Sequence, residues 1–356
     1  MSLSFLPKIG KEVLFLKGAP RMGEGSFVRL KDGGILFGFT EYTGSSWNDH
    51  ASARLSFVTS QDEGETWSQP QILLEKPDDC KNIMSLSLLR LGNGDLGAFY
   101  IRKNIDGTDG LWLIRSRDEG ATWGDPINCM GQFQNTDYYV LNNDRVLRLQ
   151  KGRLLFAACR HSICSCPDRL APGVVCFFLS DDDGFTWRKT PCELTMPIPG
   201  DPIGYQEPGL YEYADGSLWC YIRTGLGCQF QCFSRDGGQT WSQPAPNRFF
   251  SSPDSPMLVK DAGSYTLAVF NPIPRYQGRP ASEPWGRTPL VCAVSRDRGR
   301  TFPQIFYIED DLSNGYCYPA LLETHDGFLL AYYHSNNTGI CLNSCRITKV
   351  SFSELA

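Results

Sequence analysis

The sequence has no apolar stretch that approaches the roughly 18 residues a membrane-spanning helix needs. Its basic residues do not gather into runs or stripes, and 34 basic against 39 acidic residues leave a net charge of −5. Nucleic acid and anionic membranes are therefore not expected as partners. A helical period of apolar residues is nearly absent as well, which points to an all-β chain.

The N-terminal sequence also lacks the features of a secretion signal. It reads MSLSFLPKIGKEVLFLKG, without a basic start, an apolar core and a cleavage site. We therefore expect a cytoplasmic location for the chain as written.

The 14 cysteines are scattered, and several lie inside strand-like runs, such as Cys176, Cys220 and Cys292. In a cytosolic chain of this size we expect them to be small buried hydrophobic residues. One dense group leaves a zinc site open as an alternative to free thiols, although its spacing matches no standard zinc pattern. This group comprises Cys159, His161, Cys164 and Cys166.

An octet of the pattern Ser-x-Asp-x-Gly-x-Thr-Trp occurs five times, with Phe in place of Trp in the last copy. Its Ser and Asp can bond to nearby backbone, its Gly permits a turn with positive φ, and its aromatic ring can pack between sheets. Five copies cannot all form one active site, and each lacks the several carboxylates of a calcium loop. We interpret the octets as structural; they occupy residues 60–67, 116–123, 180–187, 234–241 and 295–302.

A second repeat consists of an apolar run, a glycine turn and another apolar run, which is typical of a β-hairpin. Its turn glycines recur at intervals of about 60 residues, and a third strand, an octet and a short fourth strand follow each of the first five copies. The six copies occupy residues 26–39, 85–100, 143–158, 207–222, 255–270 and 318–333.

Six four-stranded antiparallel units repeated radially predict a six-bladed β-propeller that fills residues 1–356 as a single domain. The last unit has no octet, whereas residues 11–17 form a strand without a hairpin of its own. The simplest closure pairs this N-terminal strand with the strands of residues 318–352, which removes an exposed sheet edge.

The octet is the Asp box, and with six hairpin blades the chain resembles the sialidase (neuraminidase) superfamily. The resemblance implies a site at the propeller centre. In the family, three arginines bind the substrate carboxylate, a tyrosine is the nucleophile, a glutamate lies beside it and an aspartate is the acid/base. The Asp box is shared with unrelated propellers, so it supports the fold more than the activity.

The fourth and fifth units supply matches to the glutamate and two arginines. In QEPGLYEYADGSLWCYIRT, Glu207 opens the fourth hairpin and Arg223 closes it, as in the family. In WGRTPLVCAVSRDRG, Arg287 precedes the fifth-unit strand that runs into the box. Arg275 and Arg279 lie in the same loop and are alternatives to Arg287.

The tyrosine of the family opens the sixth hairpin, eight residues before the Asp or Asn of the turn. Tyr318 stands eight residues before Asp326, although Pro319 follows it where family members often have Ser. Tyr316 is the alternative nucleophile, because it would point to the same face of a strand. Asp49 fits the acid/base, in the loop ahead of the first box.

The first arginine departs from the family pattern. PRMGEGSF has Gly23 where the family commonly has the Pro of Arg-Ile-Pro, and it adds the carboxylate of Glu24. Arg21 is the best match and Arg29 is the alternative. This departure puts strict sialic-acid specificity in doubt.

The third unit opens with a polar segment, NNDR, for which the family offers no role. By its position this segment should face the central site. Its Asp144 and Arg145 are therefore predicted to bind substrate hydroxyls, with turn formation as the alternative.

Together these residues predict a retaining exo-glycosidase with a carbohydrate substrate, which requires no metal or organic cofactor. Arginine forks bind a carboxylate, a tyrosine avoids the repulsion that a carboxylate nucleophile would meet, and Glu207 would accept the tyrosine proton. The alternatives are a propeller that hydrolyses another acidic or a pectin-derived sugar, a carbohydrate-binding propeller without turnover, and a scaffold for protein partners. The sequence does not indicate an oligomeric state.

Overall fold

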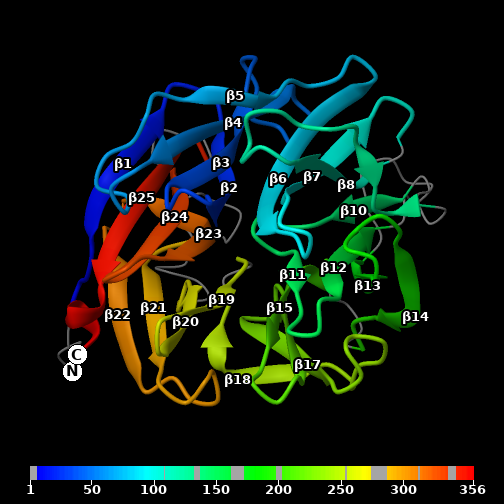
Figure 1. Cartoon of the computed structure of the whole chain (residues 1–356). Coiled ribbons are helices and arrows are strands. Elements are labelled where there is room, and N and C mark those ends of the chain that lie inside the picture. The colour runs from blue at the N-terminus through cyan, green and yellow to red at the C-terminus, as the bar shows by residue number, and fades with distance from the viewer. Residues whose placement is uncertain are drawn as a thin grey trace.

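Apolar runs on either side of each turn glycine pair as the two innermost strands of a sheet, and six such sheets surround a common axis (Figure 1). The protein is thus an all-β, six-bladed propeller of four-stranded antiparallel blades, as the repeats predict. The structure is a computed structural model. It describes residues 6–107, 109–131, 137–161, 172–197, 203–252, 255–273, 287–311, 313–335 and 342–356.

The strands of each blade run from the axis outward in chain order. Blade 1 contains β2 (Met22–Arg29), β3 (Ile35–Tyr42), β4 (Ala53–Ser60) and β5 (Gln71–Leu74). Blade 2 contains β6 (Cys80–Arg90), β7 (Leu96–Asn104), β8 (Asp109–Ser116) and β9 (Ile127–Asn128). Blade 3 has its inner strand in two pieces, and it contains β10 (Tyr138–Val140), β11 (Leu147–Arg148), β12 (Leu154–His161), β13 (Val174–Ser180) and β14 (Arg188–Leu194).

The remaining three blades follow the same order. Blade 4 contains β15 (Gln206–Glu212), β16 (Leu218–Arg223), β17 (Cys228–Ser234) and β18 (Ala245–Ser251). Blade 5 contains β19 (Leu258–Ala262), β20 (Tyr265–Phe270), β21 (Leu290–Ser295) and β22 (Gln304–Glu309). Blade 6 contains β23 (Gly315–Glu323), β24 (Gly327–Ser335), β25 (Ser344–Ser351) and, as its outer strand, β1 (Lys11–Lys17), and a short 3-10 helix, η4 (Phe352–Leu355), ends the chain.

Strand β1 closes the ring as predicted. It pairs antiparallel with β25, with Phe15 opposite Arg346 and Lys17 opposite Ser344. The last unit lacks an octet because its fourth strand comes from the other end of the chain. The closure covers the edge of β25, which would otherwise present unpaired backbone groups.

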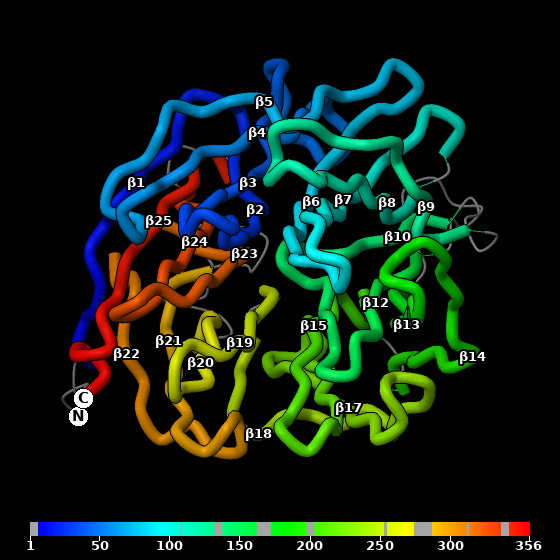
Figure 2. The backbone as a smooth tube through the Cα atoms, viewed as in Figure 1, coloured from blue at the N-terminus to red at the C-terminus, as the bar shows by residue number. Residues whose placement is uncertain are grey.

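The inner strand of four blades carries a bulge close to its start, where the strands converge on the axis (Figure 2). At each bulge two residues oppose one on the neighbouring strand, and the first of the two has a positive φ. These first residues are Glu24, Ser85, Glu207 and Tyr318, with φ between 36° and 58°. In each of these four blades, the bulge therefore points the side chain of this first residue in a direction that regular strand alternation would not give it.

The turns of the hairpins and the Asp boxes lie at the opposite end of the blades from the bulges. In the second box, Asp118 accepts from the Ser116 hydroxyl at 2.8 Å, and from the Thr122 amide at 2.8 Å and hydroxyl at 2.6 Å. The other four boxes repeat these bonds. These local hydrogen bonds are those expected of a structural turn, and a purely structural role of the octets stays a prediction.

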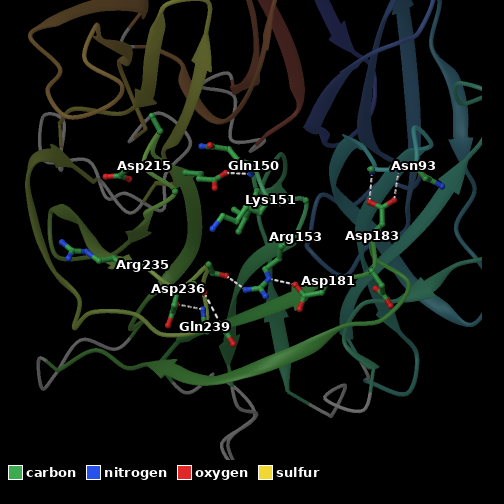
Figure 3. Close-up of a pocket in the computed structure, with 18 of the residues that line it drawn as sticks. Asn93, Gln150, Lys151, Arg153, Asp181, Asp183, Asp215, Arg235, Asp236 and Gln239 are labelled. Atoms are coloured by element: carbon green, nitrogen blue, oxygen red, sulfur yellow. Dashed lines mark hydrogen bonds and ion pairs between the residues drawn. The ribbon is translucent and has the colours of Figure 1, made fainter.

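Between blades 3 and 4, the turns and boxes surround an open hollow of about 1000 Å³ (Figure 3). Its polar groups are engaged locally: Arg153 donates to Asp181 at 2.6 Å, and Asp183 accepts from the backbone amides of Gly92 at 2.7 Å and Asn93 at 3.2 Å. The Asp183 contacts tie the Asp box of blade 3 to the hairpin turn of blade 2.

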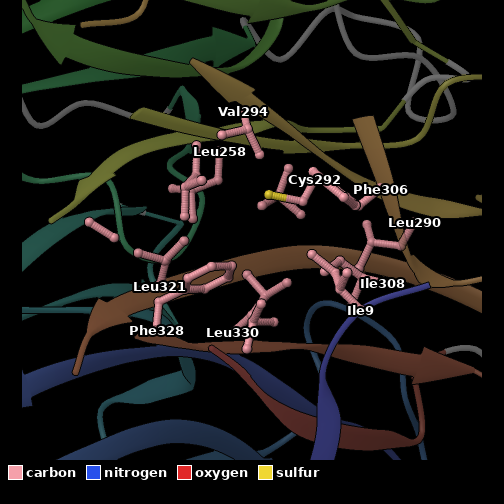
Figure 4. Packing of buried hydrophobic residues seen from close by; sticks show 14 of the residues in the cluster. Ile9, Leu258, Leu290, Cys292, Val294, Phe306, Ile308, Leu321, Phe328 and Leu330 are labelled. Atoms are coloured by element: carbon pink, nitrogen blue, oxygen red, sulfur yellow. The ribbon is translucent and has the colours of Figure 1, made fainter. Parts of the chain in front are cut away.

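Neighbouring blades pack face to face through buried apolar side chains. Between blades 5 and 6, Leu290 and Cys292 of β21 face Leu330 of β24, and Ile9 covers the outer margin of this layer (Figure 4). Truncating one such side chain to alanine typically costs about 2–5 kcal/mol. The ring is thus held by repeated sheet-to-sheet contacts, which leaves the axis for polar side chains.

The expectation of buried cysteines is met by Cys176, Cys220 and Cys292, which are free and fully buried. Cys159 is also a buried free thiol near His161, whereas Cys164 and Cys166 lie outside the described residues. Within the described ranges, no group of three or more His, Cys, Asp or Glu side chains is arranged to hold a metal ion. The same ranges contain no helix with the length and apolar character to span a membrane.

Candidate active site

Tyr318 and Glu207 meet at the axis, although 111 residues separate them in the chain. Each is the first residue of a bulge, Tyr318 in β23 and Glu207 in β15. Both are buried, and the Tyr318 hydroxyl donates to Glu207 Oε1 at 2.7 Å. Glu207 is therefore in position to accept the phenolic proton.

The surroundings of Tyr318 favour its neutral form. Burial and the negative charge of Glu207 raise the pKa of Tyr318 well above its usual value, although Arg287 and Arg223 oppose this shift. A standing phenolate is thus disfavoured near neutral pH. Nucleophilic attack by Tyr318 requires the proton to move to Glu207 as the new bond forms.

Arg223, the last residue of β16, lies beside this pair. Its Nη1 donates to Glu207 Oε2 at 2.5 Å and lies 3.5 Å from the Tyr318 hydroxyl. Register explains the contact, because Arg223 pairs with Gln206, the residue before the bulge. Arg223 therefore orients the glutamate and adds positive charge next to the phenol.

Arg287 lies over the ring of Tyr318. Its guanidinium carbon is 5.4 Å from the centre of the Tyr318 ring, and Nη1 contacts Cys317 Sγ at 3.5 Å. Its own carbonyl accepts from the amides of Tyr316 and Asn271, both at 2.9 Å. The backbone thus fixes Arg287 between blades 5 and 6, whereas Arg275 and Arg279 lie outside the described residues.

Tyr316 does not share the face of Tyr318, contrary to the alternation expected of a regular strand. The bulge changes the alternation between Cys317 and Ala320, so Tyr316 packs in the core between blades 5 and 6. Its hydroxyl donates to the carbonyl of Asp311 at 3.2 Å.

Arg21 is buried at the start of blade 1 and is held from several sides. Nε donates to the Tyr333 hydroxyl at 3.0 Å, Nη2 pairs with Glu24, and Nη1 pairs with Asp49 at 2.5 Å. The Tyr42 ring lies 5.1 Å from the guanidinium carbon. Tyr333 also connects this group to Tyr318, because the two rings meet edge to face at 5.7 Å.

The alternative first arginine, Arg29, lies at the turn end of blade 1. It forms a two-pronged pair with Glu63 of the first Asp box, at 2.7 and 3.0 Å. Its place among the turns leaves Arg21 as the arginine of blade 1 that lies near the axis.

Asp49 lies in the loop between β3 and β4, and 54% of its side chain is exposed. Its burial alone would raise the pKa of Asp49, but the charges of Arg21 and Lys103 and the Arg21 hydrogen bond outweigh it and lower this pKa to about 2. In this arrangement Asp49 is an ionised carboxylate. A role as general acid requires its pairing with Arg21 to change.

Lys103, near the end of β7, is a charged residue of this region that the sequence analysis did not identify. It is almost completely buried, and Nζ donates to the Asp49 carbonyl at 2.9 Å and the Tyr138 hydroxyl at 3.1 Å. Burial lowers the pKa of Lys103, while Asp49 counteracts the shift. Its place near the end of the strand segment FYIRKN was the indication available in the sequence.

Asp144 and Arg145 have contacts further along the axis toward the turns. Asp144 accepts from Ser26 at 2.8 Å and Lys260 at 2.6 Å, which connects blade 3 to blades 1 and 5. Arg145 donates to the Tyr221 hydroxyl at 3.1 Å and the Met257 carbonyl at 2.5 Å. These contacts tie the blades together, and substrate binding by either residue stays a prediction.

Comparison with known proteins agrees with this fold. Residues 39–331 match the BNR repeat-like domain. The anhydrosialidase of Macrobdella decora is 29% identical over 274 residues, which cover 70% of this chain and 33% of that protein. The chain thus spans about a third of the length of this curated relative.

Two solved structures are similar over most of the chain. A leech intramolecular trans-sialidase complexed with 2,7-anhydro-Neu5Ac has a TM-score of 0.73 and 16% identity, with 97% of this chain and 70% of that chain covered. The intramolecular trans-sialidase from Ruminococcus gnavus, in complex with oseltamivir carboxylate, has a TM-score of 0.71 and 16% identity, with 93% and 94% covered. The chain belongs to the BNR repeat-like family, and it is a propeller of the sialidase superfamily.

Proposed function

We propose that the protein is a retaining exo-glycosidase of sialidase type that removes a terminal sialic acid or a related acidic sugar. The observation that carries the proposal is the 2.7 Å hydrogen bond from the buried Tyr318 hydroxyl to Glu207, with Arg223 bonded to the same carboxylate. A binding protein needs no such pair of a nucleophile and a base. The names of the relatives, an anhydrosialidase and two intramolecular trans-sialidases, support the same class of chemistry.

In the proposed reaction, Tyr318 attacks the anomeric carbon while its proton passes to Glu207. The bond to the leaving oxygen breaks as protonated Asp49 donates to that oxygen. Water then attacks the same carbon and gives a proton to Asp49, the bond to Tyr318 breaks with the anomer retained, and Glu207 returns its proton to the Tyr318 oxygen. Two displacements at one carbon account for the retention.

The charges at the site fit a substrate with a carboxylate on the anomeric carbon. Arg223 and Arg287 flank the Tyr318 ring, and Arg21 lies beyond Tyr333. Planar guanidinium groups bind carboxylates with directed hydrogen bonds. A neutral phenol meets no repulsion from such a substrate, whereas a carboxylate nucleophile would.

A second candidate is the same chemistry on a different sugar. It is favoured because two carboxylates, those of Glu24 and Asp49, already pair with Arg21. Of these, Glu24 is buried within β2 and also accepts from Ser85. If Arg21 keeps both carboxylate partners, only Arg223 and Arg287 remain to bind a substrate carboxylate. Such a site would select less strongly for a substrate that carries a carboxylate.

A panel of aryl glycosides tests both candidates. Sialic acid, other ulosonic acids, uronic acids and neutral sugars would be assayed, with Tyr318→Phe as the control for contaminating activity. NMR of the first product would give its anomeric configuration. Fastest release from the sialoside with retention supports the leading proposal, and preference for a neutral sugar supports the second. No release from any member, or inversion, contradicts the proposed mechanism.

A further inference from the structure

Arg21 has few donors left for a substrate. A guanidinium has five N–H donors, and four of those on Arg21 have partners: the Tyr333 hydroxyl, Glu24, Asp49 and the Trp47 carbonyl. A two-pronged clamp on an incoming carboxylate needs two donors. One present partner must therefore leave Arg21 before it can bind an anion in this way.

The partners of Arg21 differ in their freedom to leave. Tyr333 is fully buried, and Glu24 is 2% exposed within β2 and is also bonded to Ser85. The Asp49 side chain is 54% exposed and lies on a loop. The Trp47 carbonyl is on the same loop, and its 3.5 Å contact is the longest of the four. Asp49 is therefore the only charged partner that an anion can displace without disturbing a strand.

The backbone of this loop is held separately from the Arg21 contact. Lys103 donates to the Asp49 carbonyl at 2.9 Å, and the Asn82 amide donates to the Ala51 carbonyl. Lys103 is itself held by Tyr138. The Asp49 carboxylate can thus turn away from Arg21 by side-chain rotation while the loop stays at the site.

We infer that the anionic group of the substrate replaces Asp49 on Arg21, and that this exchange converts Asp49 from an ionised partner of Arg21 into the proton donor of the reaction. The inference deepens the proposed function and rests on it. The proton comes from solvent to the Asp49 carboxylate and passes from there to the leaving oxygen.

The charges that face Asp49 determine the direction of this change. Arg21 faces it from just before β2, Lys103 from β7 and His50 from its own loop. Tyr42 of β3 lies near both Arg21 and Asp49, and Tyr138 of β10 contacts Lys103. Loss of the Arg21 contact removes the strongest stabilisation of the carboxylate. A bound anion adds a like charge nearby, so the pKa of Asp49 rises from about 2.

Calorimetry can measure this exchange without turnover. Free N-acetylneuraminic acid would be titrated into the protein at about pH 5, in two buffers of different protonation enthalpy, with its methyl ester as the uncharged probe. We expect the acid to bind with uptake of a substantial fraction of one proton, and the ester to bind without uptake.

Two variants test whether Asp49 is the residue that takes up the proton. In Asp49→Asn the uptake should disappear, and near neutral pH the affinity for the acid should rise by about fivefold because a competing partner of Arg21 is gone. Asp125→Asn is the matched control, since Asp125 is exposed two residues after the second Asp box, and it should keep the uptake.

The outcomes separate the two proposals. Binding of the acid without proton uptake, or weaker binding by Asp49→Asn, overturns the exchange and leaves the proposed activity standing. Failure of both the acid and the ester to bind the wild-type protein overturns the acidic-sugar activity and the exchange together.

Discussion

The same strands run through both ends of each blade, but the two ends have different roles. At the turn end, five Asp boxes repeat the same hydrogen bonds within eight residues. At the bulged end, the corresponding positions carry Glu24 and Glu207 in two blades but Ser85 and Tyr318 in two others, and their partners come from distant parts of the chain. Repetition thus builds the ring, and departures from the repeat form the site.

The largest effect that this comparison predicts is at the bulged end. Tyr318→Phe removes only the hydroxyl, so kcat should fall by at least about a thousandfold while binding of the free sugar acid changes little. Its melting temperature should stay close to that of the wild type, because the ring keeps its packing. The measurement pairs steady-state kinetics with calorimetry.

Retention of substantial turnover by Tyr318→Phe would contradict the nucleophile assignment. Tyr316→Phe is the matched control, since that hydroxyl bonds to the Asp311 carbonyl within the core between blades. It should lower stability slightly and leave kcat unchanged.

The next effect concerns binding. Arg287→Ala should weaken binding of an acidic substrate by about 2–5 kcal/mol, the cost of removing one partner of a desolvated charge pair. The loss should appear mainly in KM and be much smaller for a substrate without the carboxylate. Arg29→Ala, at the turn end, is the control and should change neither constant. Equal losses on acidic and neutral substrates would show that Arg287 does not bind the carboxylate.

At the turn end, the expected effect is on stability alone. Asp236→Ala removes the bonds to Ser234 and Thr240, and it should lower the melting temperature by about 2–4 °C. The KM of the folded protein should stay the same. A loss of kcat at an unchanged melting temperature would refute the purely structural role of the boxes.

The smallest effect is the acid dependence of that stability. Hydrogen bonds from threonine lower the pKa of Asp62 and Asp297 to about 2, against about 3.9 in an unfolded chain. A carboxylate with a lowered folded pKa stabilises fully above about pH 4, and its contribution is lost as the pH falls toward 2. Melting temperatures between these values should fall less steeply for Asp62→Asn than for the wild type. An unchanged slope of melting temperature against pH would show that the Asp62 carboxylate does not contribute to the acid dependence of stability.

Much of the fold follows from the sequence because its determinants are local and repeated. The hairpin turns, the boxes and the spare strand of residues 11–17 all have patterns within a few residues, and their repetition shows the blade number. Glu207 and Tyr318 were assigned through the family resemblance, because each opens a hairpin where the family has its glutamate or tyrosine.

The rest of the site depends on long-range contacts that spacing does not show. Arg21 is held by Asp49 and Tyr333, and neither contact could be derived from distance along the chain. The bulge before Ala320 changes the alternation that would have placed Tyr316 beside Tyr318. Lys103 has no repeat counterpart among the predicted residues, so only the structure identified it.

Trapping of the covalent intermediate tests the central claim most directly. A sialosyl fluoride that carries a second fluorine next to the anomeric carbon forms such an intermediate faster than water can hydrolyse the intermediate. Mass spectrometry of the digested protein should then find the sugar on the peptide that contains Tyr318, and find no adduct in Tyr318→Phe. An adduct on Glu207 or Glu24, or retained turnover without any adduct on tyrosine, would contradict the account.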